Sequence, residues 1–92
     1  MANIARLDVV ATEWIKVEEA IEGFSPSADD KFEIQNIGSK SLQIYEGANA
    51  PTTERDGFVL GLWKSATYIK KADEYLFVRG LEGLTTLNIA EK

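Results

Sequence analysis

From residue 30 onward the chain consists of short apolar or alternating segments, which are separated by turn residues at close spacing. None of these segments repeats its apolar residues at the helical period of about 3.6 residues. Short strand-like segments with regular turn signals are typical of antiparallel sandwiches and barrels. We therefore predict an all-β fold, a small antiparallel β-sandwich or jelly-roll-like barrel of about six to eight strands.

Residues 31–36 carry a clear strand pattern, because polar and apolar residues alternate along them. Residues 38–40, Gly-Ser-Lys, predict a tight hairpin loop. Residues 41–45 then predict the return strand of this hairpin, with Leu42 and Ile44 facing the core.

The rest of this region predicts a loop and further strands. Residues 46–57 lack apolar anchors and contain two glycines and a proline, so we expect a long surface loop that is free to make contacts. β-Branched and aromatic residues are enriched in the segments that follow. These segments predict strands at residues 58–63, 66–70, 74–79 and 84–90.

The first third of the chain is ambiguous. Its apolar residues fall at spacings of three and four, so a helix within residues 3–22 is one alternative. β-Favouring residues in the same region argue for extended structure. We predict one domain over residues 1–92, with an N-terminal arm at 1–11, a strand across about 12–20 and the sandwich over 12–92.

A chain of 92 residues has room for one modest hydrophobic core. Domains of this size often depend on disulfides, metals or oligomerisation. The chain has no cysteine and no histidine, so disulfides and the usual zinc sites are excluded and no metal or cofactor is expected. Oligomerisation is the support that remains.

The formal net charge is -5. Residues 1–46 carry the whole acidic excess, whereas the second half is balanced. Nucleic-acid binding depends on Lys and Arg, so neither nucleic acid nor an anionic membrane is an expected partner. Lys70, Lys71 and Arg79 are expected to be solvated. Residues 1–8 lack a secretory-signal pattern and no window is apolar enough for a membrane span, so we expect synthesis in the cytoplasm.

Catalysis is not expected, because common nucleophile and base combinations use histidine or cysteine. Neighbouring carboxylates are the remaining candidates for glycoside hydrolysis or Ca²⁺ binding. They occur at Glu18 and Glu19, Asp29 and Asp30, Glu54 and Asp56, and Asp73 and Glu74. We interpret them as solvated, since they lie in predicted turns or on polar faces without the spacing of a calcium loop. The protein is therefore predicted not to be an enzyme.

Aromatic residues are the better candidates for function. Phe32, Phe58 and Phe77 are expected to fill the core, which needs their large apolar area. An outward Trp or Tyr is a natural contact for a protein or a sugar. Trp63 is the first candidate for such a contact, and Trp14 is the second.

Several segments between residues 30 and 90 resemble small bacteriophage virion proteins. The resemblance is to short β-sandwich modules in capsid decoration or cement proteins and in tail accessory proteins. The segments that carry it are Phe32-Glu33-Ile34-Gln35-Asn36 with Gly38, Leu42-Gln43-Ile44-Tyr45-Glu46, Ala50-Pro51-Thr52, Asp56-Gly57, and Tyr75-Leu76-Phe77-Val78-Arg79-Gly80.

This resemblance implies a virion structural protein, most simply a capsid decoration or cement protein. Such proteins form symmetric oligomers, commonly trimers, and have no active site. The expected partner is the major capsid protein or another virion protein, bound through one end or through the N-terminal arm after synthesis in the host cytoplasm. Ile4, Leu7 and Val10 are then arm residues that gain order on docking, and Trp14 and Trp63 are further contact candidates.

The alternative is a carbohydrate-binding or receptor-binding module of a phage tail or adhesin. Outward Trp63, Tyr45 or Trp14 would then stack on sugar rings, and the loop over residues 46–57 would supply polar contacts. A third hypothesis, an enzyme with two carboxylates, ranks well below both.

Overall fold

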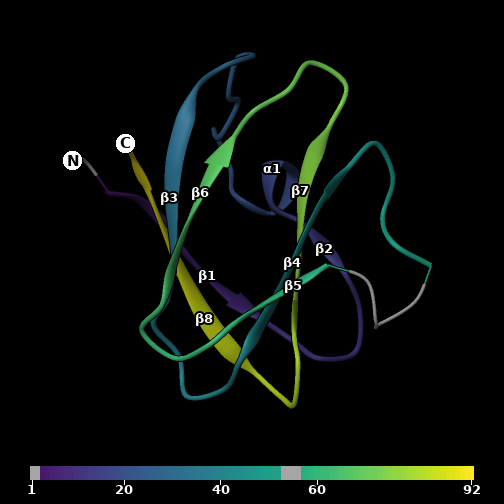
Figure 1. Ribbon diagram of the computed structural model, residues 1–92, viewed down its shortest axis with the longest axis vertical. Coiled ribbons are helices and arrows are strands. Elements are labelled where there is room, and N and C mark those ends of the chain that lie inside the picture. Colours follow the sequence, from purple (N-terminus) through teal and green to yellow (C-terminus); the bar gives the residue numbers. More distant parts are fainter. Residues whose placement is uncertain (1–2, 53–56) are drawn as a thin grey trace.

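The computed structural model describes residues 3–52 and 57–92, with side chains from residue 5 onward. Within these residues, eight strands form two four-stranded sheets in which neighbours run antiparallel (Figure 1). The first sheet has the order β1 (Asn3–Val9), β8 (Thr85–Glu91), β3 (Lys31–Asn36), β6 (Ser65–Ile69). The second has the order β2 (Ile15–Lys16), β7 (Tyr75–Gly80), β4 (Leu42–Gly47), β5 (Phe58–Leu60). The prediction of a small all-β sandwich is confirmed.

The core lies between the two sheets and follows from the alternation within the strands. In β3, Phe32 and Ile34 face inward and are buried, while their neighbours Glu33 and Gln35 are partly exposed. Aliphatic side chains from both sheets, and that of Val17 directly after β2, meet them. The most deeply buried are Val9, Val17, Leu42, Leu76, Val78, Leu87 and Ile89.

The predicted hairpin between residues 31–36 and 41–45 is wrong. Both segments are strands, but β3 pairs with β6 and β8, whereas β4 pairs with β5 and β7 in the other sheet. The turn at residues 37–41 therefore carries the chain across the sandwich. Alternation identifies the inward face of a strand but does not specify its neighbour, which explains the error.

The predicted N-terminal arm is also wrong for the part that the structure describes. Residues 3–9 form β1, which pairs with β8 at the edge of the first sheet. Ala5 and Leu7 pack against the core and Val9 is fully buried, so this segment has the alternation of a half-buried strand.

The predicted strand across residues 12–20 is reduced to β2, and a single-turn helix, α1 (Val17–Ala20), follows it. Of the helix that the sequence allowed within residues 3–22, the described residues contain only this single turn. Among the described residues, no helix has the length and apolar character to cross a membrane.

The predicted strand at 58–63 is split. β5 ends at Leu60, and a tight turn over residues 61–64 leads into β6. In this turn the Lys64 N–H donates to the Gly61 carbonyl at 3.1 Å, and the Trp63 N–H donates to the Asn36 carbonyl at 2.8 Å. The last two predicted strands agree with β7 and β8 to within a residue.

Candidate functional site

The strand registers bring three turns to one end of the sandwich, the lower end in Figure 1. Gln35 pairs with Ser65, and Leu42 pairs with both Leu60 and Gly80. Each pair places the end of one strand beside the start of another. The turns that meet in this way span residues 37–41, 61–64 and 81–84. We call this end of the molecule, together with Val10, the end face.

Val10 belongs to the end face because it directly follows β1, whose last residue Val9 pairs with Thr85 at the start of β8. The Val10 carbonyl also accepts a hydrogen bond from the Gly80 N–H at 3.0 Å. Val10 thus lies beside the turn at residues 81–84.

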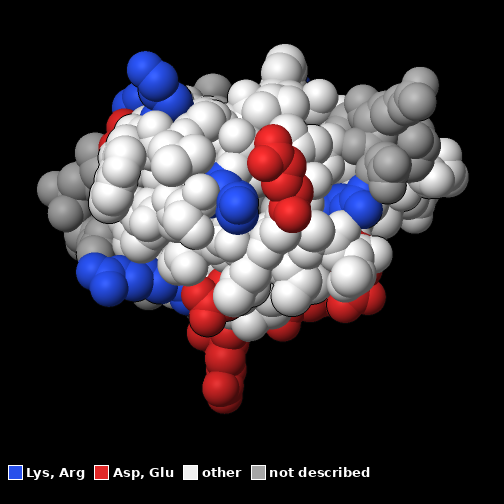
Figure 2. All heavy atoms as spheres, turned by 90° about the horizontal axis from the view of Figure 1, so that it is seen from below, with Lys and Arg blue, Asp and Glu red and all other residues white. Residues whose placement is uncertain are grey.

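The end face exposes large apolar side chains: Val10, Leu62, Trp63, Leu81 and Leu84. Lys40, Lys64 and Glu82 are the charged residues of its three turns. Viewed from this end, most of the surface is uncharged (Figure 2). Exposed apolar side chains that gather on one face, instead of being scattered singly, are typical of an interaction surface.

Trp63 stands out on the end face for its backbone as well as its side chain. Its φ is +63°, in the left-handed region, which costs an L-residue about 1–2 kcal/mol. Trp63 is 67% exposed, so little burial in the core offsets that cost. Backbone strain that brings no packing benefit is characteristic of functional positions.

Asn36 connects the turns of the end face from the interior of the sandwich. It is fully buried, and its amide donates to the carbonyls of Lys40 at 2.8 Å and Leu60 at 3.0 Å. Its side-chain oxygen accepts from the Gly38 N–H at 3.1 Å and the Thr85 hydroxyl at 2.9 Å. Every hydrogen-bonding position of the amide is therefore used, and the turns are held in a fixed arrangement.

The sequence interpretation missed this role of Asn36. The available signal was its position: it shares the inward face of β3 with Phe32 and Ile34, where an apolar residue is expected. A polar side chain at an inward position needs hydrogen-bond partners, so it indicates that backbone from another segment approaches it.

The five predicted contact residues divide between different environments. Val10 and Trp63 lie on the end face. Leu7 packs against the core within β1, so it does not serve as an arm residue. Trp14 packs edge to face on Tyr45, with ring centroids 6.3 Å apart. The side chain of Ile4 lies outside the described residues.

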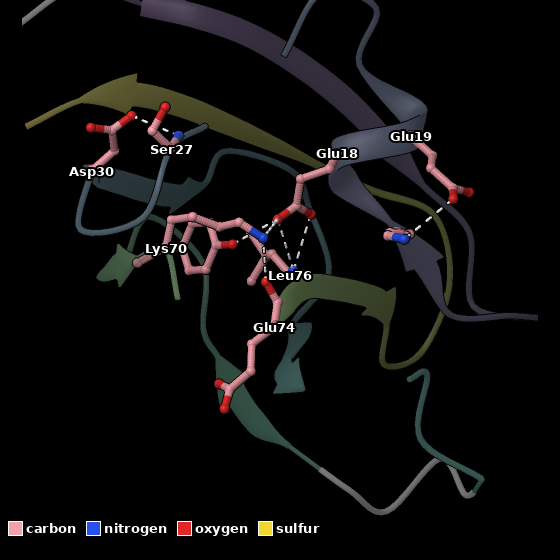
Figure 3. Close-up of polar contacts among 9 residues, drawn as sticks. Glu18, Glu19, Ser27, Asp30, Lys70, Glu74 and Leu76 are labelled. Carbon is pink, nitrogen blue, oxygen red and sulfur yellow. Dashed lines mark hydrogen bonds and ion pairs between the residues drawn. The ribbon is translucent and has the colours of Figure 1, made fainter. Parts of the chain in front are cut away.

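The opposite end of the sandwich holds a buried ion pair (Figure 3). The Glu18 carboxylate lies 3.8 Å from the Lys70 ammonium, and both side chains are more than nine-tenths buried. The same carboxylate accepts hydrogen bonds from the Tyr68 hydroxyl at 2.6 Å and the Leu76 N–H at 3.1 Å. Lys70 also donates to the Glu74 carbonyl. The prediction that Glu18 and Lys70 are solvated is wrong, because α1 directs the Glu18 side chain onto Tyr68, Leu76 and Lys70.

Other charged groups that were predicted to be solvated make ion pairs or hydrogen bonds. Glu19 pairs with Lys16 at 3.3 Å, and Asp30 accepts from the Ser27 N–H at 2.9 Å. Arg79 donates to the Ala11 carbonyl at 2.6 Å. In the part of the chain that the structure describes, no three carboxylates converge on a place that could hold a metal ion. The candidate pair Glu54 and Asp56 lies outside the described residues.

Comparison of the chain with known protein families, with curated proteins and with solved structures finds no match. Function is therefore inferred from the residues of this chain and their arrangement. The end face is the feature that most needs an explanation, because its large apolar side chains are exposed together while buried hydrogen bonds hold its turns in place.

Proposed function

We propose that this chain is a bacteriophage virion structural protein, a capsid decoration or cement protein, that oligomerises and docks its end face on the major capsid protein or another virion protein. The resemblance to small virion proteins is the reason for proposing a bacteriophage particle. The end face supplies a surface suited to docking. On this proposal the protein resides in the virion after synthesis in the host cytoplasm.

The observation that carries the proposal is Trp63, a tryptophan that is both strained and exposed at the centre of the turn over residues 61–64. Tryptophan is among the residues most often found to dominate binding energy at protein interfaces. Leu62 and Leu84 are exposed at the same end and offer the surrounding contacts that exclude water from such an anchor.

Repetition by symmetry strengthens a contact of this size. One end face is small, and a single copy is expected to bind weakly. An oligomer that presents several end faces to one particle converts later contacts into intramolecular ones, so its overall affinity exceeds that of each contact. A particle surface built from repeated subunits provides the matching array of sites.

The proposal describes a non-catalytic protein. Glu18, whose side chain is more than nine-tenths buried, has its oxygens occupied by Tyr68, Leu76 and Lys70 and is therefore engaged in holding the fold. Its role is accounted for without a substrate.

The test uses the phage whose genome encodes the chain. Mass spectrometry of gradient-purified particles is expected to find the chain in a fixed ratio to the capsid protein. Purified chain is expected to sediment with particles that lack it. Absence of the chain from purified particles, together with failure of the purified chain to sediment with them, would overturn the proposal.

Matched variants connect this binding to the end face. Leu84 is 59% exposed on the end face, whereas the exposed Glu19 lies on α1 at the opposite end of the sandwich. Leu84→Ser and Trp63→Gly are expected to weaken sedimentation with particles at least tenfold, which corresponds to about 1.4 kcal/mol. Glu19→Ser is the control and is expected to bind as the unmodified chain does, provided that all variants oligomerise equally.

The exposed indole of Trp63 also favours a second candidate, a carbohydrate-binding or receptor-binding module of a phage tail or adhesin. An exposed aromatic ring offers a face on which a sugar ring can stack. A glycan array separates the two candidates: binding to a defined glycan that is lost in Trp63→Ala would favour the module. The same array without signal, combined with sedimentation on particles, would favour the virion protein.

A further inference from the structure

The side of the sandwich formed by β5 and β6 is incompletely closed. Phe58 pairs with Ile44, so the two side chains lie on the same, inward face of the second sheet. Ile44 is buried, whereas Phe58 is 75% exposed. The prediction that Phe58 fills the core is therefore wrong for the isolated chain, although its strand position is that of a core residue.

A small apolar pocket of about 110 Å³ lies beside Phe58 between the two sheets. Its lining includes buried core side chains from both sheets: Ile34, Ile44, Leu60, Tyr68 and Leu76. Sites for small-molecule ligands usually measure about 300–1,000 Å³, so this pocket is an opening in the core and not a typical ligand site. We call the outer edge of β6, together with Phe58, the open side.

The strand β6, at one edge of the first sheet, has backbone groups that point away from the molecule. The Asn36 N–H donates to the Lys64 carbonyl, and the Lys70 N–H donates to the Asp30 carbonyl. In an antiparallel ladder, residues that bond to the neighbouring strand alternate with residues that face away from it. The N–H and C=O groups that face away from β3 are therefore those of Ser65, Thr67 and Ile69. No strand of the described residues lies beside them.

The strand β1, at the opposite edge of the same sheet, has free backbone groups as well. The Thr86 carbonyl faces β3, because it accepts the Ile37 N–H. Asp8 pairs with Thr86, so the N–H and C=O of Asp8 are directed away from β8. Arg6, two residues earlier on β1, is directed in the same way.

The two edges of the first sheet run in opposite directions. β6 begins beside the turn at residues 61–64 and runs away from the end face, whereas β1 ends beside Val10 and runs toward it. A second copy in the same orientation therefore presents a β1 that is antiparallel to β6. Repeated pairing of this kind is head to tail, and it leaves every end face at the same end of the assembly.

The charges at the two edges are complementary. On the outer face of β6, the exposed Lys92 ammonium donates to the Thr67 hydroxyl at 2.6 Å. On β1, the exposed Asp8 carries a carboxylate. Pairing of β6 with β1 brings this cation and this anion to one junction. Pairing of β6 with a second β6 would instead bring two Lys92 cations together, which is unfavourable.

We propose that copies of this chain assemble head to tail into a ring, in which β6 of one copy pairs antiparallel with β1 of the next and the first sheets become continuous. The inference rests on the oligomerisation that the proposed function includes. It gives that function the arrangement it requires, since all end faces of the ring can meet one particle surface. A head-to-tail contact forms a ring when the rotation between copies closes.

The register of the pairing follows from the free backbone groups and the charges. With Asp8 of the next copy opposite Thr67, its carboxylate lies beside the Lys92 ammonium. Arg6 then lies opposite Ile69, which is uncharged. Both pairs join residues whose N–H and C=O groups are free, so each pair can exchange two hydrogen bonds.

This register also has the stagger of a closed sheet. The pairs across the first sheet place Arg6 at the height of Ser65, so the next copy is displaced by four residues relative to one at equal height. Four residues over a sheet of four strands is one residue per strand. Eight-stranded barrels with a shear of eight have the same ratio and close by tilting their strands about 36°. The displacement is therefore of the size that ring closure requires.

The same contact covers the open side. Leu7 of the next copy lies between its Arg6 and Asp8 and faces inward, on the face of the continuous sheet that carries Tyr68. It therefore lies toward Phe58 and the apolar pocket. Leu7 is only partly buried in the single chain, so the contact removes apolar surface of both copies from water.

The first test is the mass of the purified full chain, measured by sedimentation velocity and light scattering without virions. One assembly of defined mass, above that of the monomer, is expected. Thr67→Pro removes an N–H that points away from β3 and is expected to give a folded monomer. Thr67→Ser keeps the N–H and the hydroxyl and is expected to assemble. A monomeric unmodified chain, or a mass that rises without limit with concentration, would overturn the ring.

Introduced cysteines identify which edges meet, and they decide the matter if Thr67→Pro does not fold. The chain has no cysteine of its own. Two strands separate β6 from β1 within one copy, so Thr67 and Asp8 are roughly 14 Å or more apart there, beyond the reach of a disulfide. Co-expressed Thr67→Cys and Asp8→Cys copies are expected to form disulfide-linked dimers on oxidation, whereas each variant alone stays unlinked. Links in Thr67→Cys alone, or none in the mixture, would overturn the pairing of β6 with β1.

A charge exchange tests the register. Asp8→Lys and Lys92→Glu each bring like charges together at the junction, so each is expected to raise the concentration needed for assembly by about tenfold or more. The double variant restores an opposite pair and is expected to assemble as the unmodified chain does. A double variant that assembles no better than the two single variants would overturn the placement of Asp8 beside Lys92.

The ring and the virion function fail separately. A monomeric chain that still sediments with particles overturns the head-to-tail contact and leaves the virion function standing. A ring that does not bind particles overturns the virion function and leaves the contact standing.

Discussion

The Tyr68 hydroxyl donates a hydrogen bond of 2.6 Å to the Glu18 carboxylate, which joins the end of β6 to the helix α1. Glu18 accepts the Leu76 N–H as well, so one carboxylate connects α1 to both sheets. Lys70 neutralises the charge of Glu18. The end of the sandwich opposite the end face is therefore held by a polar cluster, whereas the middle is held by apolar packing.

Glu18→Gln is expected to destabilise the protein by about 3–5 kcal/mol, because it leaves the Lys70 ammonium buried without a counter-charge. Urea unfolding followed by tryptophan fluorescence measures the loss. Glu19→Gln is the matched control on the same helix: its side chain is 75% exposed and its pair with Lys16 is expected to contribute less than about 1 kcal/mol. Equal losses in the two variants would contradict the assigned role of Glu18.

The double variant Glu18→Gln with Lys70→Met sharpens this test. Removal of both charges eliminates the unpaired ammonium, so the double variant is expected to be more stable than Glu18→Gln alone. A double variant whose loss equals the sum of the two single losses would show that the two side chains do not act as a pair.

Stability is expected to fall at alkaline pH through Tyr68. Burial first, and then the hydrogen bond to Glu18, raise the pKa of the Tyr68 hydroxyl above its usual value of about 10. The folded state therefore keeps its proton at a pH where the unfolded state releases it. By linkage, this contribution is complete below about pH 10 and decreases as the pH rises further.

Tyr68→Phe is the variant that tests this contribution. It is expected to be less stable than the unmodified chain at pH 7, since it loses the hydrogen bond, and to lose less stability between pH 10 and pH 11. Tyr45→Phe, which changes a ring packed on Trp14, is the control. An equal alkaline loss in Tyr68→Phe and in the unmodified chain would assign that loss to other groups.

Glu46 is expected to affect stability in the opposite pH range. Partial burial raises its pKa above 4.5, with Lys71 lowering it and Glu74 raising it to smaller extents. A raised pKa means that stability from this group is complete below about pH 4.5 and is lost as the pH rises through the folded-state value. Glu46→Gln is therefore expected to raise the melting temperature slightly at pH 7 and to leave it unchanged at pH 4.

Glu46 lies on the wall of an open hollow of about 430 Å³, beside Phe58, Lys71 and Glu74. Glu82→Gln, on the end face, serves as the control with the same change of charge. If Glu82→Gln raises the melting temperature at pH 7 as much as Glu46→Gln does, the effect comes from net charge and not from the burial of Glu46.

Asn36→Asp is expected to cost about 3 kcal/mol or more, because it replaces two donors by acceptors that face the carbonyls of Lys40 and Leu60 in a buried place. Gln35→Glu makes the same chemical change at the neighbouring residue, whose amide donates to the Trp63 carbonyl near the surface. It is expected to cost less than about 1 kcal/mol. Thermal unfolding of both variants compares the two positions directly.

The all-β class could be predicted from the sequence because strand alternation is local. Phe32 and Ile34 mark an inward face without reference to any other segment. Strand pairing is not local, and for this reason the sequence suggested a hairpin where the chain changes sheets. β1 was mistaken for an arm because one of its inward residues is Ala5, whose small side chain weakens the apolar pattern.

The candidate site was predictable only in part. Trp63 and Val10 were identified from their residue types, but their meeting at one end depends on the registers of four strand pairs. The pair of Glu18 and Lys70 joins residues distant in sequence, so each side chain alone resembled an ordinary solvated charge. Phe58 has the alternation of a core residue, and nothing local indicated that the sandwich is open beside it.

Trp63 provides the last prediction, which concerns both the stability of the chain and the binding of its end face. Its φ of +63° is unfavourable for any residue with a side chain, whereas glycine adopts it without steric cost. Trp63→Gly is therefore expected to be more stable than Trp63→Ala by about 1 kcal/mol, although both lose the indole. Chemical denaturation measures this difference, which isolates the backbone strain from the side chain.

Both variants are nevertheless expected to lose binding to the partner of the end face, since the indole is exposed and the core does not depend on it. A residue that lowers stability and is needed for binding is what a stability–function trade-off predicts. If Trp63→Gly were instead less stable than the unmodified chain by more than about 1 kcal/mol, the indole would be supporting the fold. The exposed, strained tryptophan would then have a structural explanation, and the main observation that supports docking through the end face would be removed.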